Sequence, residues 1–142
     1  MSQRTVLVTG AFGQVGWRTA EILLQRGYTV VATDLPTDTS RTVAARLAAA
    51  AHPGTLLPVY ADLTDADAVK GMLTEHSPSA IVHLAAMLSP ASYRNPKLAR
   101  RVNVGGTTNL STAQPRCLRR RRWCTRPVRR STDPAIPTAT PS

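Results

Sequence analysis

The sequence predicts an α/β fold in which a parallel sheet, truncated after about four strands, has helices on both faces and is followed by a disordered basic tail. Strand and helix patterns alternate from Thr5 to Leu110, and this alternation requires crossovers that bring parallel strands side by side. A turn rich in glycine joins the first strand pattern to the first helix pattern. The 142 residues are 42% apolar, which is enough for the core of one domain.

The first strand–helix–strand unit follows from residue type and spacing. Thr5–Thr9 is a short β-branched run that ends at Gly10, as expected of a buried parallel strand. Gln14–Arg26 has apolar residues at helical spacing and stops at Gly27, a common C-terminal signal of helices. Tyr28–Thr33 repeats the strand pattern.

The same pattern then repeats. Arg41–His52 is rich in alanine and predicts a helix, and Thr55–Ala61 predicts the third strand. Thr64 and Asp67 have the spacing of a capping box, in which each side chain bonds a free amide of the helix start. This predicts a third helix that ends near residue 75.

The last two elements complete the predicted sheet. Ala80–Leu84 is an apolar run that predicts the fourth strand. The pair Asn95-Pro96 is a helix-start signal, and it predicts a helical stretch from about Lys97 through Leu110.

Three glycines carry the first chemical signal. Gly10, Gly13 and Gly16 directly follow the first strand and open the first helix. Gly10 permits a tight exit from the strand, Gly13 lets a pyrophosphate approach the backbone, and Gly16 lets the helix pack closely on the sheet. The pyrophosphate then meets free amides and the positive end of the helix dipole. The pattern predicts a Rossmann-type dinucleotide site, and the alternative is a glycine-rich turn without a ligand.

Asp34 indicates which dinucleotide is expected. It ends the second strand, 18 residues after Gly16. A carboxylate there accepts hydrogen bonds from the adenosine ribose and repels a 2′-phosphate, which favours NAD over NADP. An arginine just beyond this carboxylate would offset the repulsion, but the nearest one, Arg41, is not adjacent in the sequence.

Four segments together resemble a known family. They are Thr9-Gly10-Ala11-Phe12-Gly13-Gln14-Val15-Gly16, Asp62-Leu63-Thr64-Asp65, His83-Leu84-Ala85-Ala86 and Val102-Asn103-Val104-Gly105-Gly106-Thr107-Thr108-Asn109-Leu110. Their order and spacing resemble the extended short-chain dehydrogenases/reductases, in particular the NAD-dependent epimerase/dehydratase family. The resemblance covers residue 4 to about residue 112. It implies hydride transfer to and from NAD at an alcohol carbon of a sugar nucleotide, a sterol or a related substrate.

The resemblance also implies a role for each segment. Asp62 and its neighbouring backbone would hold the adenine, the small residues after His83 would line the nicotinamide side, and Asn103 would brace the active-site strand. The residues alone leave alternatives open: Asp62 as a loop cap, His83 as a satisfied core histidine, and Asn103 as a cap or a bridge between helices. The predicted cofactor-binding residues are Gly10, Phe12, Gly13, Gln14, Val15, Gly16, Asp34, Asp62, Leu63, Leu84, Ala85, Ala86 and Asn103.

The catalytic groups of the family are not found at their expected place in this sequence. The family uses a Ser or Thr together with a Tyr and a Lys four residues apart on a helix, where the Tyr is the general acid/base. Tyr93 and Lys97 have this spacing, but Pro96 disfavours the helix that would align them, and the pair precedes Asn103. We therefore expect the chain as given to be catalytically inactive, and we predict no catalytic residue and no metal ligand.

The composition changes abruptly near Gln114. Residues 115–142 hold eight arginines and one acidic residue, whereas all eight glycines lie before the change. We therefore divide the chain into residues 1–112, the N-terminal half of an NAD(P)-binding Rossmann domain, and residues 113–142, an Arg/Pro-rich tail predicted to be disordered.

The tail has three interpretations. An Arg-rich arm would bind nucleic acid non-specifically, with Trp123 stacking on a base. A metal site at Cys117 and Cys124 is disfavoured by their spacing and by the lack of a following His. A shifted reading frame is favoured, because the frame that starts at the third codon base permits Val-Val-Tyr-Thr-Ser-Ser-Ala-Ala-Val-Tyr-Gly from Arg122 onward. That string resembles the family's fifth strand and active-site Ser motif.

The remaining signals concern location and partners. No apolar run approaches the ~20 residues of a membrane-spanning helix. Met1–Arg4 leads directly into the first strand without a signal-peptide pattern, and two cysteines do not suggest a disulfide framework. These observations predict a cytoplasmic protein that binds a dinucleotide and no membrane, with its oligomeric state left open.

Overall fold

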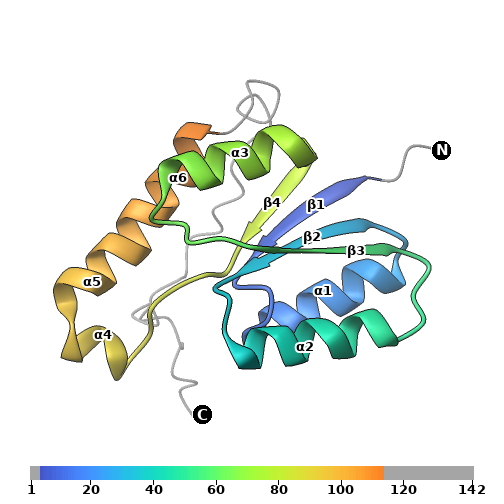
Figure 1. Cartoon of the computed structure of the whole chain (residues 1–142), viewed down its shortest axis with the longest axis horizontal. Coiled ribbons are helices and arrows are strands. Elements are labelled where there is room, and N and C mark those ends of the chain that lie inside the picture. Colours follow the sequence, from blue (N-terminus) through green and yellow to red (C-terminus); the bar gives the residue numbers. More distant parts are fainter. Residues whose placement is uncertain (1–3, 114–142) are drawn as a thin grey trace, which may run out of the picture.

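Four parallel strands form a single sheet in the order β3-β2-β1-β4 (Figure 1). The computed structural model describes residues 4–113, and the tail beyond Ala113 lies outside the described residues. The strands are β1 (Thr5–Thr9), β2 (Thr29–Asp34), β3 (Thr55–Tyr60) and β4 (Ala80–His83). This confirms the predicted Rossmann-type α/β fold and places each strand within two residues of its predicted bounds.

Helices cover both faces of the sheet. Helices α1 (Gly16–Gln25) and α2 (Asp38–Ala49) lie on one face, and α3 (Ala66–His76) and α6 (Gly106–Ala113) lie on the other (Figure 1). Successive residues of β1 enter different cores: Val8 packs in the cluster on the α1 side, and Leu7 packs in the cluster on the α3 side. Burial on both faces is why the strands read as continuous apolar runs rather than as alternating patterns.

The register brings the carboxyl ends of the strands to one edge. Thr9 of β1 pairs with Thr33 on one side and with His83 on the other. Asp34 of β2 pairs with Tyr60 of β3. Parallel pairing therefore places the turn after β1, the predicted ribose-binding carboxylate and the segment after β4 next to one another.

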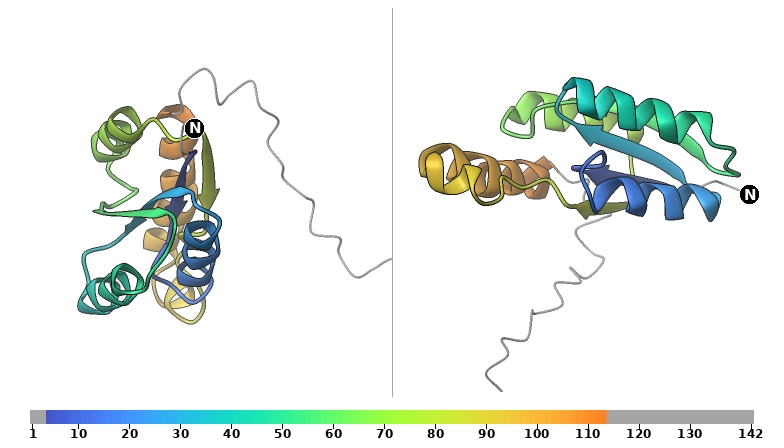
Figure 2. Two further views of the ribbon diagram at one scale, coloured as in Figure 1. Left: turned by 90° about the vertical axis from the view of Figure 1, so that its right-hand side faces the viewer. Right: turned by 90° about the horizontal axis from the view of Figure 1, so that it is seen from below.

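A nearly continuous helical stretch follows β4. It consists of α4 (Ala91–Arg94), α5 (Pro96–Arg100), the π-helical turn η1 (Arg101–Gly105) and α6. The side chain of Asn95 caps α5 by accepting a hydrogen bond from the Leu98 amide at 3.1 Å, which confirms the predicted start signal. Figures 1 and 2 show α4 and α5 extending past the carboxyl ends of the strands. The sequence pattern did not predict α4 or the π-helical turn.

The predicted capping box of α3 is wrong. Asp65, not Thr64, is the N-cap, and its Oδ1 accepts hydrogen bonds from the amides of Asp67 (3.0 Å) and Ala68 (3.1 Å). Thr64 instead donates its hydroxyl proton to Asp62. A charged carboxylate at position 65 is a stronger acceptor than the hydroxyl at position 64, so the helix begins one residue later.

Helix α2, by contrast, begins earlier than predicted. It starts at Asp38 rather than at Arg41, because Thr37 is its N-cap and accepts a hydrogen bond from the Ser40 amide at 3.1 Å. The alanine-rich pattern located the middle of the helix and missed this polar start. The earlier start brings Arg41 into the first turns of the helix, near the edge of the sheet.

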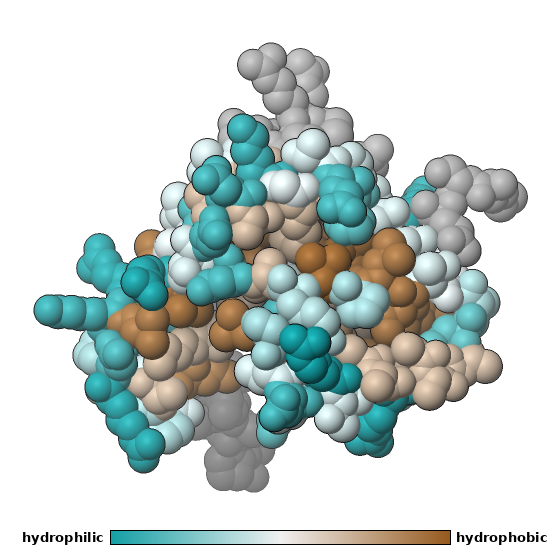
Figure 3. Space-filling view, viewed as in Figure 1, coloured by the Kyte–Doolittle hydropathy of each residue, from teal (hydrophilic) through white to brown (hydrophobic). Residues whose placement is uncertain are grey.

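Part of the sheet on the α3 side remains uncovered. Leu57 and Val59 of β3 pack against the core on this side but are only partly buried. Figure 3 shows apolar surface over the sheet beside α3. Among residues 4–113, no helix is both long enough and apolar enough to cross a membrane.

The position of the α3 cap gives a stability prediction. We expect Asp65→Ala to lower the free energy of unfolding by about 1 kcal/mol, because two amides at the helix start lose their acceptor. Thr64→Ala is the matched control, with an expected change of about a few tenths of a kcal/mol, because its hydrogen bond is exposed to water. Urea unfolding followed by circular dichroism measures both. A larger loss for Thr64→Ala would restore the capping box.

Candidate functional site

Two of the three glycines are required by the fold itself. Gly10 has a φ of +63°, and a Cβ there would lie 2.8 Å from the backbone of Ala85. A Cβ on Gly16 would lie 1.9 Å from the carbonyl oxygen of Gly10. The exit of β1 is therefore pressed against both the start of α1 and the segment after β4, and side chains at these positions would separate them.

Gly13 is different, because the protein does not require a glycine there. A Cβ at Gly13 would meet only the Gly10 carbonyl oxygen, at the ordinary contact distance of 3.4 Å. The residue is exposed at the tip of the turn. Packing within the described residues therefore does not explain this glycine, and the open backbone leaves room for a ligand to approach.

The start of α1 has unused capacity for an anion. Within the described part of the chain, the amides of Gln14 and Val15 have no hydrogen-bond partner. Val15 is the N-cap and contributes no side-chain cap, and the first turn contains no acidic residue. Free amides and an uncompensated helix dipole are the features that bind phosphate groups, so the residues present fit the pyrophosphate of a dinucleotide.

Asp34 connects β2 to the glycine turn. Its Oδ2 accepts a hydrogen bond from the Phe12 amide at 3.1 Å, and its Oδ1 accepts one from the Leu35 amide at 2.9 Å. These two contacts fix the orientation of the carboxylate. Each oxygen still has a free lone pair, which leaves capacity for two ribose hydroxyl groups.

An aromatic and cationic cluster lies beside this carboxylate, and sequence reasoning did not find it. The Tyr60 ring lies 6.1 Å from the Phe12 ring between centroids, and the Arg41 guanidinium lies 4.9 Å from the Tyr60 centroid. Tyr60 pairs with Asp34 across the sheet. Arg41 is therefore near the ribose end of the site, although it is not adjacent to Asp34 in the sequence.

Asp62 caps its own turn, as the loop-cap alternative stated. Its Oδ1 accepts hydrogen bonds from the Thr64 amide (2.9 Å) and the Thr64 hydroxyl (2.8 Å). These two bonds, helped by the positive charge of Arg101, hold the pKa of Asp62 below its ordinary value. Oδ2 has no partner among the described residues, so it is available to a ligand.

Leu63 contributes its side chain to the core rather than to the site. It is 9% exposed, and a Cβ on Gly106 of α6 would lie 3.2 Å from its Cβ. Its carbonyl oxygen accepts a hydrogen bond from Asn109 Nδ2 at 2.9 Å. Only the backbone of Leu63 can therefore face a ligand.

His83 is a satisfied histidine at the end of β4. Its Nδ1 lies 2.6 Å from the Thr9 hydroxyl oxygen, and its Nε2 lies 2.9 Å from the Thr107 hydroxyl oxygen. Burial lowers its pKa. The imidazole thus links β1, β4 and α6. This is the alternative of a satisfied core histidine that the sequence left open.

The three residues after His83 differ in accessibility. Leu84 and Ala86 are exposed, and Ala85 is half-buried. The amides of Leu84 and Ala85 both donate to the Thr9 hydroxyl oxygen, at 3.1 and 3.2 Å. The backbone after β4 is therefore held directly against the exit of β1.

Asn103 braces the chain beyond this point. Its Oδ1 accepts a hydrogen bond from the Met87 amide at 2.7 Å, and its Nδ2 donates to the Met87 carbonyl at 3.1 Å. Sequence reasoning assigned no role to Thr9 or Thr107, although both belong to the segments that carry the resemblance. For Thr9, a polar residue at the end of a buried apolar strand was the available signal.

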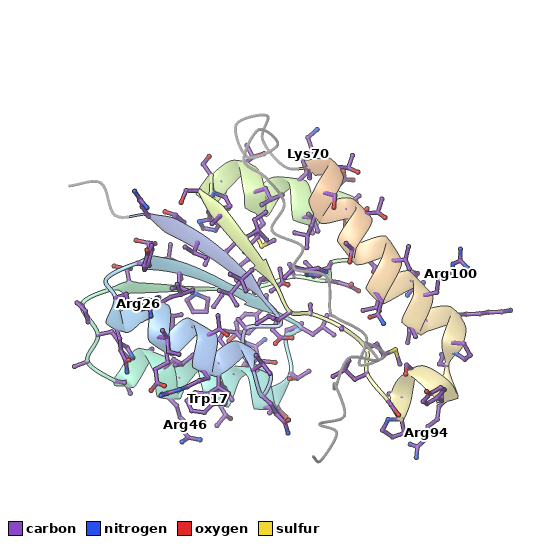
Figure 4. All side chains as sticks on the ribbon, turned by 180° about the vertical axis from the view of Figure 1, so that it is seen from behind. Trp17, Arg26, Arg46, Lys70, Arg94 and Arg100 are labelled. Atoms are coloured by element: carbon purple, nitrogen blue, oxygen red, sulfur yellow. The ribbon has the colours of Figure 1, made fainter. Side chains whose placement is uncertain are left out.

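The rest of the described surface shows no metal-binding cluster. Among residues 4–113, no three His, Cys, Asp or Glu side chains are grouped so as to hold a metal ion. Figure 4 shows Trp17 and Arg46 side by side, and Arg94 and Arg100 projecting outward from α4 and α5. Trp17 and Arg46 line a shallow hollow between α1 and α2 that contains none of the predicted cofactor residues.

Comparisons with known proteins agree with this geometry. The family model described as GDP-mannose 4,6 dehydratase matches residues 7–134. The UDP-glucose 4-epimerase of Mycolicibacterium smegmatis is 40% identical over 108 residues, which are 75% of this chain and 33% of that protein. The structure of a Thermus thermophilus UDP-glucose 4-epimerase complexed with NAD aligns with a TM-score of 0.63 at 32% identity, over 77% of this chain and 33% of that one.

A further solved structure supports the same assignment. Bordetella bronchiseptica WbmH in complex with NAD⁺ aligns with a TM-score of 0.62 at 30% identity, over 79% of this chain and 35% of that one. The chain thus spans about a third of the length of these relatives. Because the family model covers most of the chain, the resemblance read from the four motifs is confirmed. The chain belongs to the GDP-mannose 4,6 dehydratase family, within the NAD-dependent epimerase/dehydratase group of short-chain dehydrogenases/reductases.

Proposed function

We propose that this chain binds NAD along the carboxyl edge of its sheet. The observation that carries the proposal is the open backbone at Gly13, next to unpartnered amides at Gln14 and Val15. In this arrangement the glycine turn holds the pyrophosphate, Asp34 the adenosine ribose and Asp62 the adenine. When bound, NAD supplies a hydride acceptor, which no protein side chain provides.

The other half of the cofactor would lie toward β4. Leu84, Ala85 and Ala86 line that side in the proposal, because they follow β4 and adjoin the exit of β1. Asn103 acts there through the backbone of Met87 rather than by contact. Leu63 faces the cofactor with its backbone only. Phe12 and Gly16 hold the turn in place: the Phe12 amide bonds Asp34, and Gly16 lets α1 pack against the Gly10 carbonyl.

We propose NAD rather than NADP as the preferred cofactor. The Asp34 carboxylate has a fixed orientation and would repel a 2′-phosphate. The Arg41 guanidinium is already engaged over the Tyr60 ring, and a 2′-phosphate would have to compete with that contact. Two relatives named above have structures that contain NAD, which supports this preference.

We further propose that the chain as given does not catalyse hydride transfer. Tyr93 and Lys97 belong to separate helices, α4 and α5, because Asn95 leaves helical geometry between them with a φ of −139°. The Tyr93 side chain is 82% exposed. No aligned Tyr–Lys pair is therefore available as general acid/base within the described residues.

The relatives suggest a substrate class. The curated relative named above is a UDP-glucose 4-epimerase, so a sugar nucleotide is the substrate class that we propose for a full-length protein with this N-terminal part. Residues 1–112 would serve as the N-terminal half of its NAD-binding domain. The cytoplasm is its proposed location.

A nucleic-acid-binding function is the second candidate. Residues 76–132 contain twelve Lys and Arg residues and no Asp or Glu, so positive charge is concentrated in the second half of the sequence. This function would depend on the Arg-rich tail, which lies outside the described residues. Removing residues 114–142 would abolish nucleic-acid binding and spare NAD binding if both proposals hold.

Calorimetry on the full 142-residue chain tests the cofactor proposal. We expect weak NAD binding and an ADP affinity close to that for NAD, because most of the proposed contacts are to the adenosine half. We also expect no oxidoreductase or epimerase turnover, since loss of general acid/base catalysis alone costs about 10²–10⁴ in rate. Failure of both NAD and ADP to bind would refute the proposal.

Gly13 provides the sharper variant. We expect Gly13→Ala to weaken NAD binding about tenfold, because the new methyl group occupies the space proposed for the pyrophosphate. The unfolding transition should stay unchanged, since a Cβ there meets no protein atom closer than 3.4 Å. Gly71→Ala is the matched control, because a Cβ at Gly71 meets nothing within 4 Å and lies on α3. Equal NAD affinities in the two variants would contradict the proposed site.

A further inference from the structure

The hydrogen bonds around Thr9 determine where its proton must lie. The Thr9 hydroxyl oxygen accepts two amide protons, from Ala85 at 3.2 Å and from Leu84 at 3.1 Å, and the Leu84 amide is shared with the Thr9 carbonyl oxygen at 3.2 Å. A hydroxyl oxygen has two acceptor lone pairs, so both are used. The one remaining polar contact, to His83 Nδ1 at 2.6 Å, must therefore be a donation from Thr9 to the imidazole.

This donation determines the proton on His83 as well. Because Nδ1 accepts, a neutral imidazole must carry its proton on Nε2 and donate it to the Thr107 hydroxyl oxygen at 2.9 Å. Thr107 in turn donates its own proton to the Asn103 carbonyl oxygen at 2.6 Å. The hydrogen bonds that run from Thr9 through His83 and Thr107 to the Asn103 carbonyl oxygen therefore all have the same direction.

Protonation of His83 would break this order. A second ring proton on Nδ1 would face the Thr9 hydroxyl, whose oxygen already accepts two amides. One of the three contacts to Thr9 would then be lost. Among residues 4–113, no acidic or basic side chain forms an ion pair or hydrogen bond with the imidazole, so no charge compensates the cation.

We propose that His83 is a positioning residue that, as the neutral Nε2–H tautomer, holds the backbone of Leu84 and Ala85 through Thr9. The importance of this backbone for a dinucleotide rests on the function proposed above. His83 itself contacts no ligand in this account. Its effect reaches the site through the Thr9 hydroxyl, which both strand ends share.

Nitrogen-15 NMR on the full-length chain tests the tautomer. The His83 signals are identified by their loss in His83→Gln. We expect an unprotonated Nδ1 and a protonated Nε2 at a pH of about 7, and a protonation midpoint below the ordinary pKa value of 6.5, as burial requires. The amide signals of Leu84 and Ala85 should shift with the same midpoint. The opposite tautomer, or amides that ignore this titration, would overturn the proposal.

Substitutions on α6 test the positioning effect. Thr107→Val removes the acceptor for Nε2–H, and we expect hydrogen exchange at the Ala85 amide to become about tenfold faster. The effect at Leu84 should be smaller, because its amide also bonds the Thr9 carbonyl oxygen. Thr107→Ser keeps the hydroxyl and should restore slow exchange. Thr108→Val is the matched control, because the exposed Thr108 hydroxyl bonds only the Val104 carbonyl of its own helix.

Two readouts separate this proposal from a general loss of stability and from the proposed function. The Val31 amide in the central strand β2 should keep its exchange rate in Thr107→Val, which shows that the sheet is intact. A uniform acceleration that includes Val31, or no effect at Ala85, would refute the positioning role. If the wild-type chain bound no NAD while these amides responded as expected, the cofactor proposal would fail and the role of His83 would stand.

Discussion

The hydroxyl group of Thr9 is the contact on which the open side of the site depends. Its oxygen accepts hydrogen bonds from the first two amides after β4, and its proton is donated in a hydrogen bond to His83 Nδ1. Gly10 follows directly, and its lack of a side chain lets the two strand ends approach to this distance. Without the small glycine the hydroxyl would be out of reach. Without the hydroxyl the Ala85 amide would lose this partner, and the Leu84 amide would keep only the Thr9 carbonyl oxygen.

The two ends of the proposed site are therefore built differently. On the adenosine side, the turn from Gly10 to Gly16, Asp34 and Asp62 act through hydrogen bonds to residues near them in the sequence or on the adjacent strand. On the other side, Asn103, Thr107 and Asn109 reach back from one helical stretch to hold three separate segments. The glycine turn and Asp34 can form once β1 and β2 pair, and Asp62 also needs β3, whereas the contacts of the helical stretch require the whole order of the sheet.

The sequence predicted the local half well and the long-range half only in outline. The strands, the glycine turn and Asp34 were predictable because residue type and spacing over a few positions determine them. Asn103 was found only through the resemblance, because no periodicity encodes its contact with Met87, 16 positions away. Asp65 was missed as a cap because two adjacent polar residues competed for one role. Arg41 is not adjacent to Asp34 in the sequence, and only the early start of α2 brings it over Tyr60.

The π-helical turn at Arg101–Gly105 has a consequence for how this region tolerates insertion and deletion. A π turn contains one residue more than an α turn, so it takes up one additional residue within a single turn while the helix after it keeps its orientation. Asn103 lies inside this turn, and Thr107 lies one turn beyond it. Removing one residue of this turn other than Asn103 would convert it into a regular α turn and would leave Thr107 facing His83 and Asn109 facing Leu63. A loss of one residue, which in a regular helix would turn all later side chains by about 100°, would therefore be absorbed in this stretch by the wide turn.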